Sequence, residues 1–209
     1  MMLVSYKRIS ALMLGLFLAL AATVSQARPT VNATADSTSA SVLTDDQIAT
    51  LQFMREEEKL ARDVYLTLYG IYGETVFSNI MAAEQTHFDA IGALLEKYGI
   101  EDPAANDVHG QFVNPDLQAL YYELTTAGAK DLLSALNVGG LIEETDMRDL
   151  ANAIDESDRR DIDRVYTNLR DGSKNHLRAF VDSVESLGVT YEPQYLTDAE
   201  LQAILDEAS

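Results

Sequence analysis

The sequence contains no cysteine, no tryptophan and only 4 prolines. The absence of cysteine excludes disulfides, thiolate metal ligands, cysteine nucleophiles and a lipid-modified cysteine anchor. It also excludes a rubredoxin-like electron-transfer site within the chain. In an oxidising compartment, the fold must therefore rely on its core alone.

Positive charge is also scarce, with 15 Lys and Arg against 34 Asp and Glu and a formal net charge of −19. An acidic surface repels nucleic acid and anionic lipid, so no nucleic-acid partner is expected. No glycine-rich phosphate loop and no nucleophile elbow is present. Most of the negative charge is expected to lie on a solvated surface.

The chain has one long hydrophobic run, Ile9 to Val24, which follows Lys7 and Arg8 and precedes the small residues around Ala27. This run is shorter than the roughly 20 residues of a membrane span. We interpret residues 1–27 as a signal peptide, 28–43 as a Ser- and Thr-rich leader and 44–209 as one domain. The protein is expected to be exported, to the periplasm or outside the cell, without stable membrane insertion after cleavage. An uncleaved anchor is the alternative.

Strand-like alternation is missing, and hydrophobic residues instead recur at helical spacing. Capping signals predict two helix starts, at Thr44-Asp45-Asp46-Gln47 and Thr197-Asp198-Ala199-Glu200. The pattern predicts helices from Thr44 to Gly70 or Gly73, and over 74–98, 115–126, 129–154 with a weak point at Gly139-Gly140, 157–187, and after Thr197. The predicted fold is all-α: an antiparallel four-helix bundle with short extra helices.

Acids and histidines fall on the inward stripes of these helices: Glu58, Glu84, His87, Glu143, Asp146 and His176. A buried carboxylate is costly unless it is paired, hydrogen-bonded or bound to metal. Carboxylate with imidazole suits iron, manganese or zinc better than calcium. Each element has a simpler alternative: solvated charged runs around Glu58 and at Glu143-Glu144, a surface Glu–His pair, and a core histidine at 176. The third histidine of the mature chain, His109, is expected at the surface.

Several segments resemble known ferritin-like proteins. Glu58-Lys59-Leu60-Ala61-Arg62-Asp63-Val64-Tyr65 and Glu84-Gln85-Thr86-His87 are similar to the first two ligand helices of rubrerythrin-type proteins. The fuller set resembles a bacterial ferritin-like domain family of unknown function, numbered 2202, through Glu57 to Asp63, Leu141-Ile142-Glu143-Glu144 and Gly172 to Phe180. This resemblance covers about residues 44–205 and implies a ferritin-like bundle.

The resemblance implies that Glu58, Glu84, His87, Glu143 and His176 are metal ligands, with Asp146 as an additional or alternative ligand. Glu58 and Glu143 are the expected bridges, and Glu143 is favoured over Glu144 because it is in step with Met147 and Leu150. Tyr65 is either a core aromatic or a residue with a role beside the metal. The sequence departs from the full pattern at Ser173, where a ligand Glu is expected three residues before His176. Three outcomes are open: one metal, two metals with water or Asp146 filling the gap, or a lost site.

The expected function is therefore an exported ferritin-like protein that binds one or two iron or manganese ions, with redox chemistry on oxygen or peroxide. The alternative is a non-catalytic helical bundle that serves as an interaction or structural module of the cell envelope. Iron storage by a cage is a weaker option, because the extra helices disfavour cage assembly. Metal ions are the expected partners, a homodimer is left open, and the sequence identifies no catalytic residue.

Overall fold

A computed structural model describes residues 43–207, and this part of the chain forms helices and connecting segments without strands. The predicted all-α class is confirmed. The helices are α2 (Asp45–Tyr72), α3 (Thr75–Tyr98), α4 (Pro115–Gly128), α5 (Leu132–Glu156), α6 (Arg160–Ser186) and α7 (Asp198–Asp206). The predicted signal peptide and almost all of the predicted leader lie outside the described residues.

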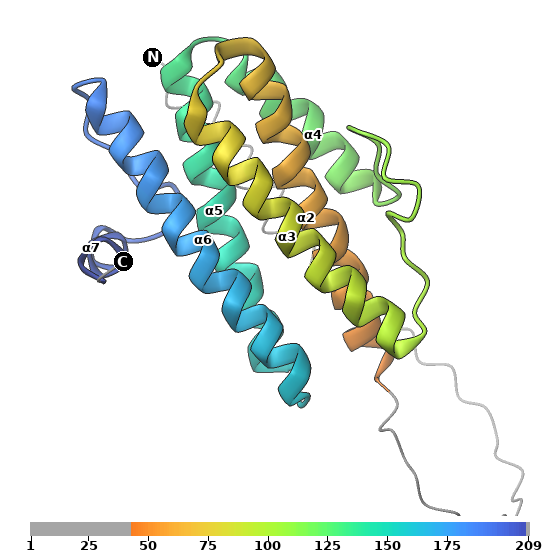
Figure 1. Cartoon of the computed structure of the whole chain (residues 1–209). Coiled ribbons are helices and arrows are strands. Elements are labelled where there is room, and N and C mark those ends of the chain that lie inside the picture. The colour runs from red at the N-terminus through yellow and green to blue at the C-terminus, as the bar shows by residue number, and fades with distance from the viewer. Residues whose placement is uncertain (1–42, 208–209) are drawn as a thin grey trace, which may run out of the picture.

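The four long helices lie side by side, with α2 antiparallel to α3 and α5 antiparallel to α6 (Figure 1). Residues 99–114 and α4 connect α3 to α5 along the outside of α2 (Figure 1). α7 lies beside α6 after an irregular segment. The long connection from α3 to α5 covers a face of α2 that would otherwise meet solvent.

Local signals set the ends of several helices. Thr44 and Gln47 form the predicted capping box, and Thr197 and Glu200 form the second one. Gly99 ends α3 with a φ of 66°, a left-handed conformation that favours glycine. α2 continues through Gly70 and ends at Gly73, which has a φ of 69°. These predicted boundaries agree with the structure within a few residues.

The predicted weak point at Gly139-Gly140 is wrong, because α5 is continuous through both residues. A Cβ at position 139 would lie 2.3 Å from Cε1 of Phe180, and one at position 140 would lie 2.2 Å from the Tyr191 hydroxyl. Both glycines are therefore required by close packing rather than by a break in the helix.

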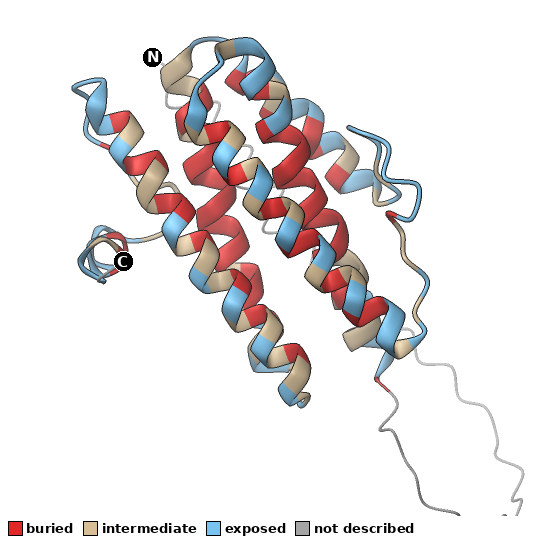
Figure 2. Ribbon diagram, in the orientation of Figure 1, coloured by how far each residue is buried: buried red, intermediate tan, exposed pale blue. Residues whose placement is uncertain are grey.

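Helices α2 and α5 are enclosed on all sides near their middle (Figure 2). Every residue from Met54 to Tyr65 is buried, and so is every residue from Val138 to Met147. The charged runs around Glu58 and at Glu143-Glu144 are therefore buried, and the interpretation that they are solvated is wrong. The physical reason is the cover supplied by residues 99–114, α4 and the segment after α6.

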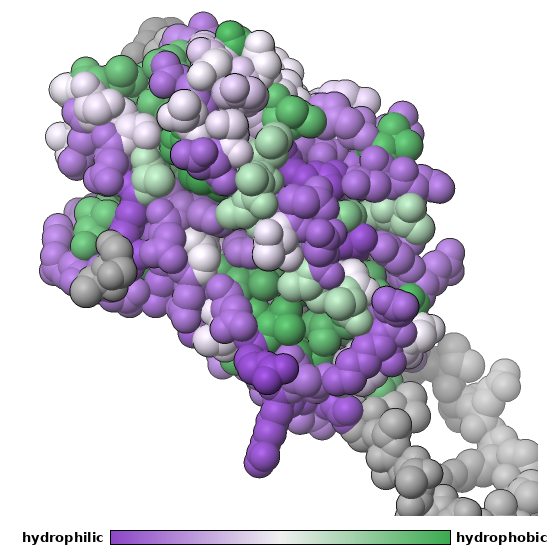
Figure 3. Space-filling view, in the orientation of Figure 1, coloured by the Kyte–Doolittle hydropathy of each residue, from purple (hydrophilic) through white to green (hydrophobic). Residues whose placement is uncertain are grey.

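One face of the molecule is mostly hydrophilic, with hydrophobic side chains gathered toward its lower half (Figure 3). Within residues 43–207, no helix combines the length and hydrophobicity needed to cross a bilayer. Leu43, assigned to the leader by the sequence, is buried and belongs to one of the hydrophobic clusters.

Candidate metal centre

The polar residues singled out by the sequence lie in one layer between two hydrophobic clusters. One cluster, which we call the upper cluster, includes Val64, Phe77 and Phe180. The other, the lower cluster, includes Met54, Ile91 and Leu169. Each of the four long helices contributes hydrophobic residues to both clusters and polar residues to the layer between them. The layer is therefore built by four helices at mid-length.

His87 of α3 lies between two carboxylates. Its Nδ1 is 2.9 Å from Oε2 of Glu84 on the same helix and 3.4 Å from Oε2 of Glu58 on α2. The spacing of three residues places Glu84 and His87 on one face of α3. Because α2 packs against this face, Glu58 completes the group.

His176 of α6 has a matching environment. Its Nδ1 is 2.8 Å from Oε1 of Glu84 and 3.3 Å from Oε2 of Glu143 on α5. The two imidazole rings stack with centroids 5.3 Å apart. Glu84 therefore spans both histidines with its two oxygens, while Glu58 and Glu143, the expected bridges, each lie beside one histidine.

These close approaches lie at ion-pair distance, but none is a hydrogen bond in standard geometry. Nδ1 of His87, Nδ1 of His176, Oε1 of Glu58 and Oδ1 of Asp146 are all buried without a hydrogen-bond partner. Possible ligand atoms of Glu84, His87 and His176 lie within 4.8 Å of one another. Imidazole nitrogens and carboxylate oxygens that converge in this way fit a metal ion with imidazole and carboxylate ligands.

Burial and neighbouring charge strongly shift the ionisation of this layer. Burial alone would lower the pKa of each histidine, but the facing carboxylates raise the pKa of His87 to about 11 and that of His176 to about 10. Burial would raise the pKa of Glu84, yet the two histidines hold it at about 2. Burial and the nearby Glu84 carboxylate raise the pKa of Glu58 to about 7, although His87 opposes this shift. The metal-free site therefore holds protons that a metal would displace.

Asp146 lies beside the same layer, one turn after Glu143 on α5. Its Oδ2 accepts a hydrogen bond of 2.5 Å from the Ser173 hydroxyl of α6. Both side chains are buried. The position at which the sequence lacks a glutamate is thus in contact with the extra aspartate.

Tyr65 contacts the layer from the upper cluster. Its hydroxyl donates a hydrogen bond of 2.5 Å to Oε1 of Glu143, and its ring packs against Phe77 and Phe180. Both alternatives from the sequence are therefore met in part: Tyr65 is a core aromatic that also contacts a site carboxylate. Because Oε1 of Glu143 accepts this bond, its Oε2 is directed to His176.

Gly172 makes room for His87. A Cβ at position 172 would lie 2.6 Å from Nε2 of His87, too close for any side chain without a shift of the ring. Both small residues of the Gly172-Ser173 pair therefore border a polar side chain of the layer.

The sequence missed two further buried acids, Glu57 of α2 and Asp149 of α5. Neither carboxylate oxygen of Glu57 has a hydrogen bond in standard geometry. Burial and the charges of Asp149, Asp146 and Glu58 raise the pKa of Glu57 well above its usual value. The sequence did contain a signal for Asp149, because this residue is three positions after Asp146 and shares its face of α5.

Glu144, the neighbour of Glu143, has a different role. Its carboxylate accepts hydrogen bonds from the Tyr191 hydroxyl and from the backbone N–H groups of Gln194, Tyr195 and Leu196. Glu144 therefore anchors the segment after α6 and is directed away from the two histidines.

Comparisons with known proteins agree on a relationship but give no activity. The DUF2202 family, described as an uncharacterized protein domain, matches residues 47–208. The uncharacterized protein MJ0754 of Methanocaldococcus jannaschii is 49% identical over 156 residues, which cover 75% of this chain and 84% of that protein. The crystal structure of hypothetical protein MJ0754 from Methanococcus jannaschii matches with a TM-score of 0.78 and 45% identity, covering 83% of this chain and 99% of the other.

Proposed function

This chain belongs to the DUF2202 family, and we propose that it binds iron or manganese in the polar layer between its two hydrophobic clusters. One observation carries the proposal. Two buried histidines each direct Nδ1 toward two carboxylates at 2.8–3.4 Å, and neither nitrogen makes a hydrogen bond in standard geometry. A bound cation would satisfy both nitrogens and the surrounding negative charge.

We also propose that the bundle is of the ferritin-like kind. Such proteins place a glutamate from each of two helices, and a Glu–x–x–His pair from each of the other two, around two metals. Here Glu58 comes from α2 and Glu143 from α5, while Glu84 and His87 form the pair on α3. The long connection from α3 through α4 to α5 supports the same arrangement (Figure 1).

Each side chain has a distinct part in this proposal. Glu84 would hold both ions, because its two oxygens face different histidines. His87 with Glu58 would hold one ion, and His176 with Glu143 the other. Tyr65 fixes the orientation of Glu143 by its hydrogen bond. The two hydrophobic clusters keep bulk water from the layer.

Bound iron or manganese would supply redox chemistry with oxygen or peroxide. The layer of carboxylates and imidazoles can bind such an ion without thiolates, in agreement with the absence of cysteine. Any reductant must come from another molecule.

We propose in addition that the protein is exported, because residues 1–27 have the basic, hydrophobic and small-residue parts of a signal peptide. Expression of the full chain, followed by amino-terminal sequencing of the mature protein, should give a new terminus at Arg28. An intact Met1 in the membrane fraction would instead support an uncleaved anchor.

Elemental analysis tests the metal proposal. The full chain is expressed, and its product is purified without chelator alongside His176→Ala and Glu84→Ala. Glu96→Ala is a matched control, because Glu96 is exposed on the same helix as Glu84. We expect near-stoichiometric iron or manganese in the parent and the control, and loss in both site variants. A parent that stays metal-free after anaerobic loading would contradict the proposal and favour a non-catalytic module of the envelope.

A further inference from the structure

The departure at Ser173 coincides with a second unusual feature on the facing helix. Ser173 stands three residues before His176, at the position where the ferritin-like pattern has its fourth glutamate. Its hydroxyl donates to Oδ2 of Asp146 at 2.5 Å and lies 2.9 Å from the Leu169 carbonyl oxygen, with one proton shared between the two acceptors. Ser173 is completely buried. A carboxylate from α5 thus occupies the space next to this short side chain.

The other oxygen of Asp146 is available to the layer. Oδ1 of Asp146 is buried and has no hydrogen-bond partner. Asp146 is three residues after Glu143 on α5, and Ser173 is three residues before His176 on α6, so their contact lies on the helix faces that carry these two candidate ligands. Asp146 therefore lies among the candidate ligands, although no cation in the described residues pairs with it.

The number of possible metal ligands can be compared with that of a full ferritin-like site. A full ferritin-like site has four carboxylates and two histidines. The residues that the sequence singled out supply the same number, with Asp146 of α5 as the fourth acid: Glu58, Glu84, Glu143, Asp146, His87 and His176. The donor set is complete, but one carboxylate comes from a different helix.

We propose that Asp146 replaces the missing α6 glutamate as a metal ligand and that Ser173 is the residue that positions it. This inference rests on the proposed metal-binding function. A glutamate at position 173 would meet Asp146, because even the short serine side chain contacts it. The serine leaves space for the aspartate and donates the hydrogen bond that orients it. In this exchange, α5 supplies the fourth carboxylate in place of α6, and the site retains two metal positions.

Metal loading of matched variants tests the exchange. The parent, Asp146→Ala, Ser173→Ala and the double variant Asp146→Ala/Ser173→Glu are loaded anaerobically with Fe(II) alone, and bound iron per chain is measured. Asp155→Ala controls for the loss of an acid, because Asp155 is exposed on the same helix. Urea unfolding of each metal-free protein shows whether the alanine variant folds. If it folds poorly, Asp146→Asn, which keeps the shape of the side chain, is used in its place.

We expect Asp146→Ala to bind about one ion fewer than the parent, and the double variant to recover it. Ser173→Ala should bind iron roughly 10- to 100-fold more weakly, as is typical when a residue that orients a ligand is removed. If Asp146→Ala, or Asp146→Asn where that variant is used, binds as much iron as the parent and with the same affinity, the exchange is overturned. The metal-binding proposal then stays intact. A parent that binds no iron would overturn both.

Discussion

Helix α2 carries two sets of buried charges that differ in how fully they are paired. The side facing the 99–114 connection carries Arg55, Lys59, Arg62 and Asp63, and every one of these charges has a partner of opposite sign. The side facing α3 and α5 carries Glu57 and Glu58, which lack a complete set of hydrogen bonds. Equal burial therefore accompanies full pairing on one side and incomplete pairing on the other.

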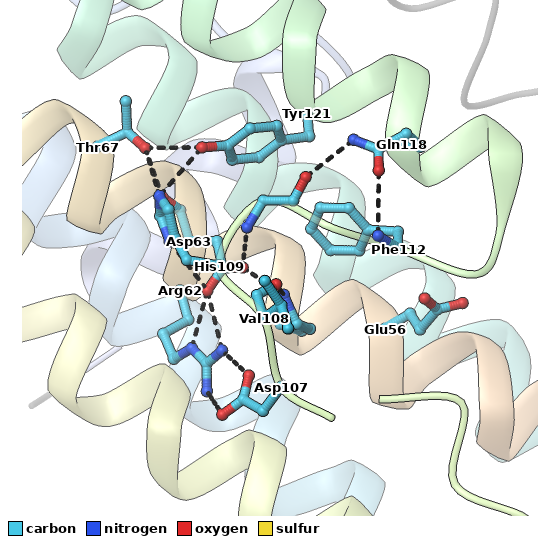
Figure 4. Close-up of polar contacts among 12 residues, drawn as sticks. Glu56, Arg62, Asp63, Thr67, Asp107, Val108, His109, Phe112, Gln118 and Tyr121 are labelled. Atoms are coloured by element: carbon cyan, nitrogen blue, oxygen red, sulfur yellow. Dashed lines mark hydrogen bonds and ion pairs between the residues drawn. The ribbon is translucent and has the colours of Figure 1, made fainter. Parts of the chain in front are cut away.

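The paired side forms a dense network around Asp63 (Figure 4). Asp63 accepts hydrogen bonds from Lys59 at 2.5 Å, from Arg62 at 2.9 Å and from the Gly110 backbone N–H at 2.8 Å. Lys59 also donates to the Val108 carbonyl. His109 lies at the edge of this network with its side chain 46% exposed, so it takes no part in the candidate metal centre.

The two sets of buried charges differ in what can stabilise them. Charges that find partners within the chain fix the connection to α2 and need no ligand. Charges that remain unpartnered in a buried layer would be costly unless protons or a cation compensate them. The comparison predicts that changes on the paired side affect folding, while changes on the other side affect metal binding.

The largest effect is expected from Asp63→Ala, which would leave Lys59 buried without its carboxylate. Removing one partner of a buried ion pair typically lowers stability by about 3–5 kcal/mol. Urea unfolding of the metal-free protein measures this loss, while bound metal per folded chain should not change. Asp107→Asn is the control, because the Asp107 side chain is 42% exposed and should contribute less than about 1 kcal/mol. A loss for Asp63→Ala no larger than for this control would contradict the assigned role of the network.

The second effect concerns pH. With pKa values of about 11 and 10, His87 and His176 are protonated in the metal-free protein at neutral pH, whereas a metal requires neutral imidazole. Metal binding should therefore release protons, and affinity should fall as pH falls. Displacement of both protons weakens binding by about 100-fold per pH unit below neutrality. Calorimetric titration with Mn(II) in buffers of different ionisation enthalpy counts the protons, and binding without proton release would be the contrary result.

A third, smaller effect is expected from Gly172→Ala, which separates helix stability from ligand geometry. Alanine in place of glycine favours a helix by about 1 kcal/mol, yet the new Cβ must displace the His87 ring. Mn(II) affinity should fall at least about tenfold without loss of helix content. Gly70→Ala is the matched control, because a Cβ there has nothing within 4 Å. Equal Mn(II) affinities in the two variants would show that metal binding does not depend on the position of the His87 ring.

The smallest effect is expected from Glu57→Gln, and it has the opposite sign. The pKa of Glu57 is raised by burial and by neighbouring acids, so its ionised form destabilises the fold increasingly as pH rises above the unfolded value near 4.5. The neutral amide removes this penalty and should stabilise the metal-free protein by on the order of 1 kcal/mol at pH 8. Urea unfolding at pH 5 and pH 8 should show the gain mainly at pH 8. A loss of stability at pH 8 would indicate an unrecognised partner.

The sequence was informative where local chemistry decides the structure. Thr44 with Gln47 fixes the start of α2, and Gly99 fixes the end of α3, because caps depend on residues close in the chain. Helical spacing also placed Glu84 and His87 on one inward face. The preference for Glu143 over Glu144, made from its register with Met147 and Leu150, agrees with the contacts of the two side chains.

Long-range cover could not be predicted from these patterns. The run from Arg55 to Lys59 looks solvated in the sequence, but the connection some 40–60 residues later covers Arg55, Glu56 and Lys59. Glu57 was missed for the same reason, since its burial depends on α5. The contact between Ser173 and Asp146 joins residues 27 apart on two helices, so local spacing gives no sign of it.

Metal-dependent stability tests the central claim most directly. The unfolding free energy of the parent and of Glu58→Ala is measured in urea without metal and at increasing Mn(II). A ligand that binds only the folded state should stabilise the parent by about 1.4 kcal/mol per tenfold rise in Mn(II) for each ion, once the sites are saturated, and Glu58→Ala much less. A parent whose unfolding free energy is the same at every Mn(II) concentration, and equal to that of Glu58→Ala throughout, would contradict the claim that the buried carboxylates and histidines between the two clusters form a metal site.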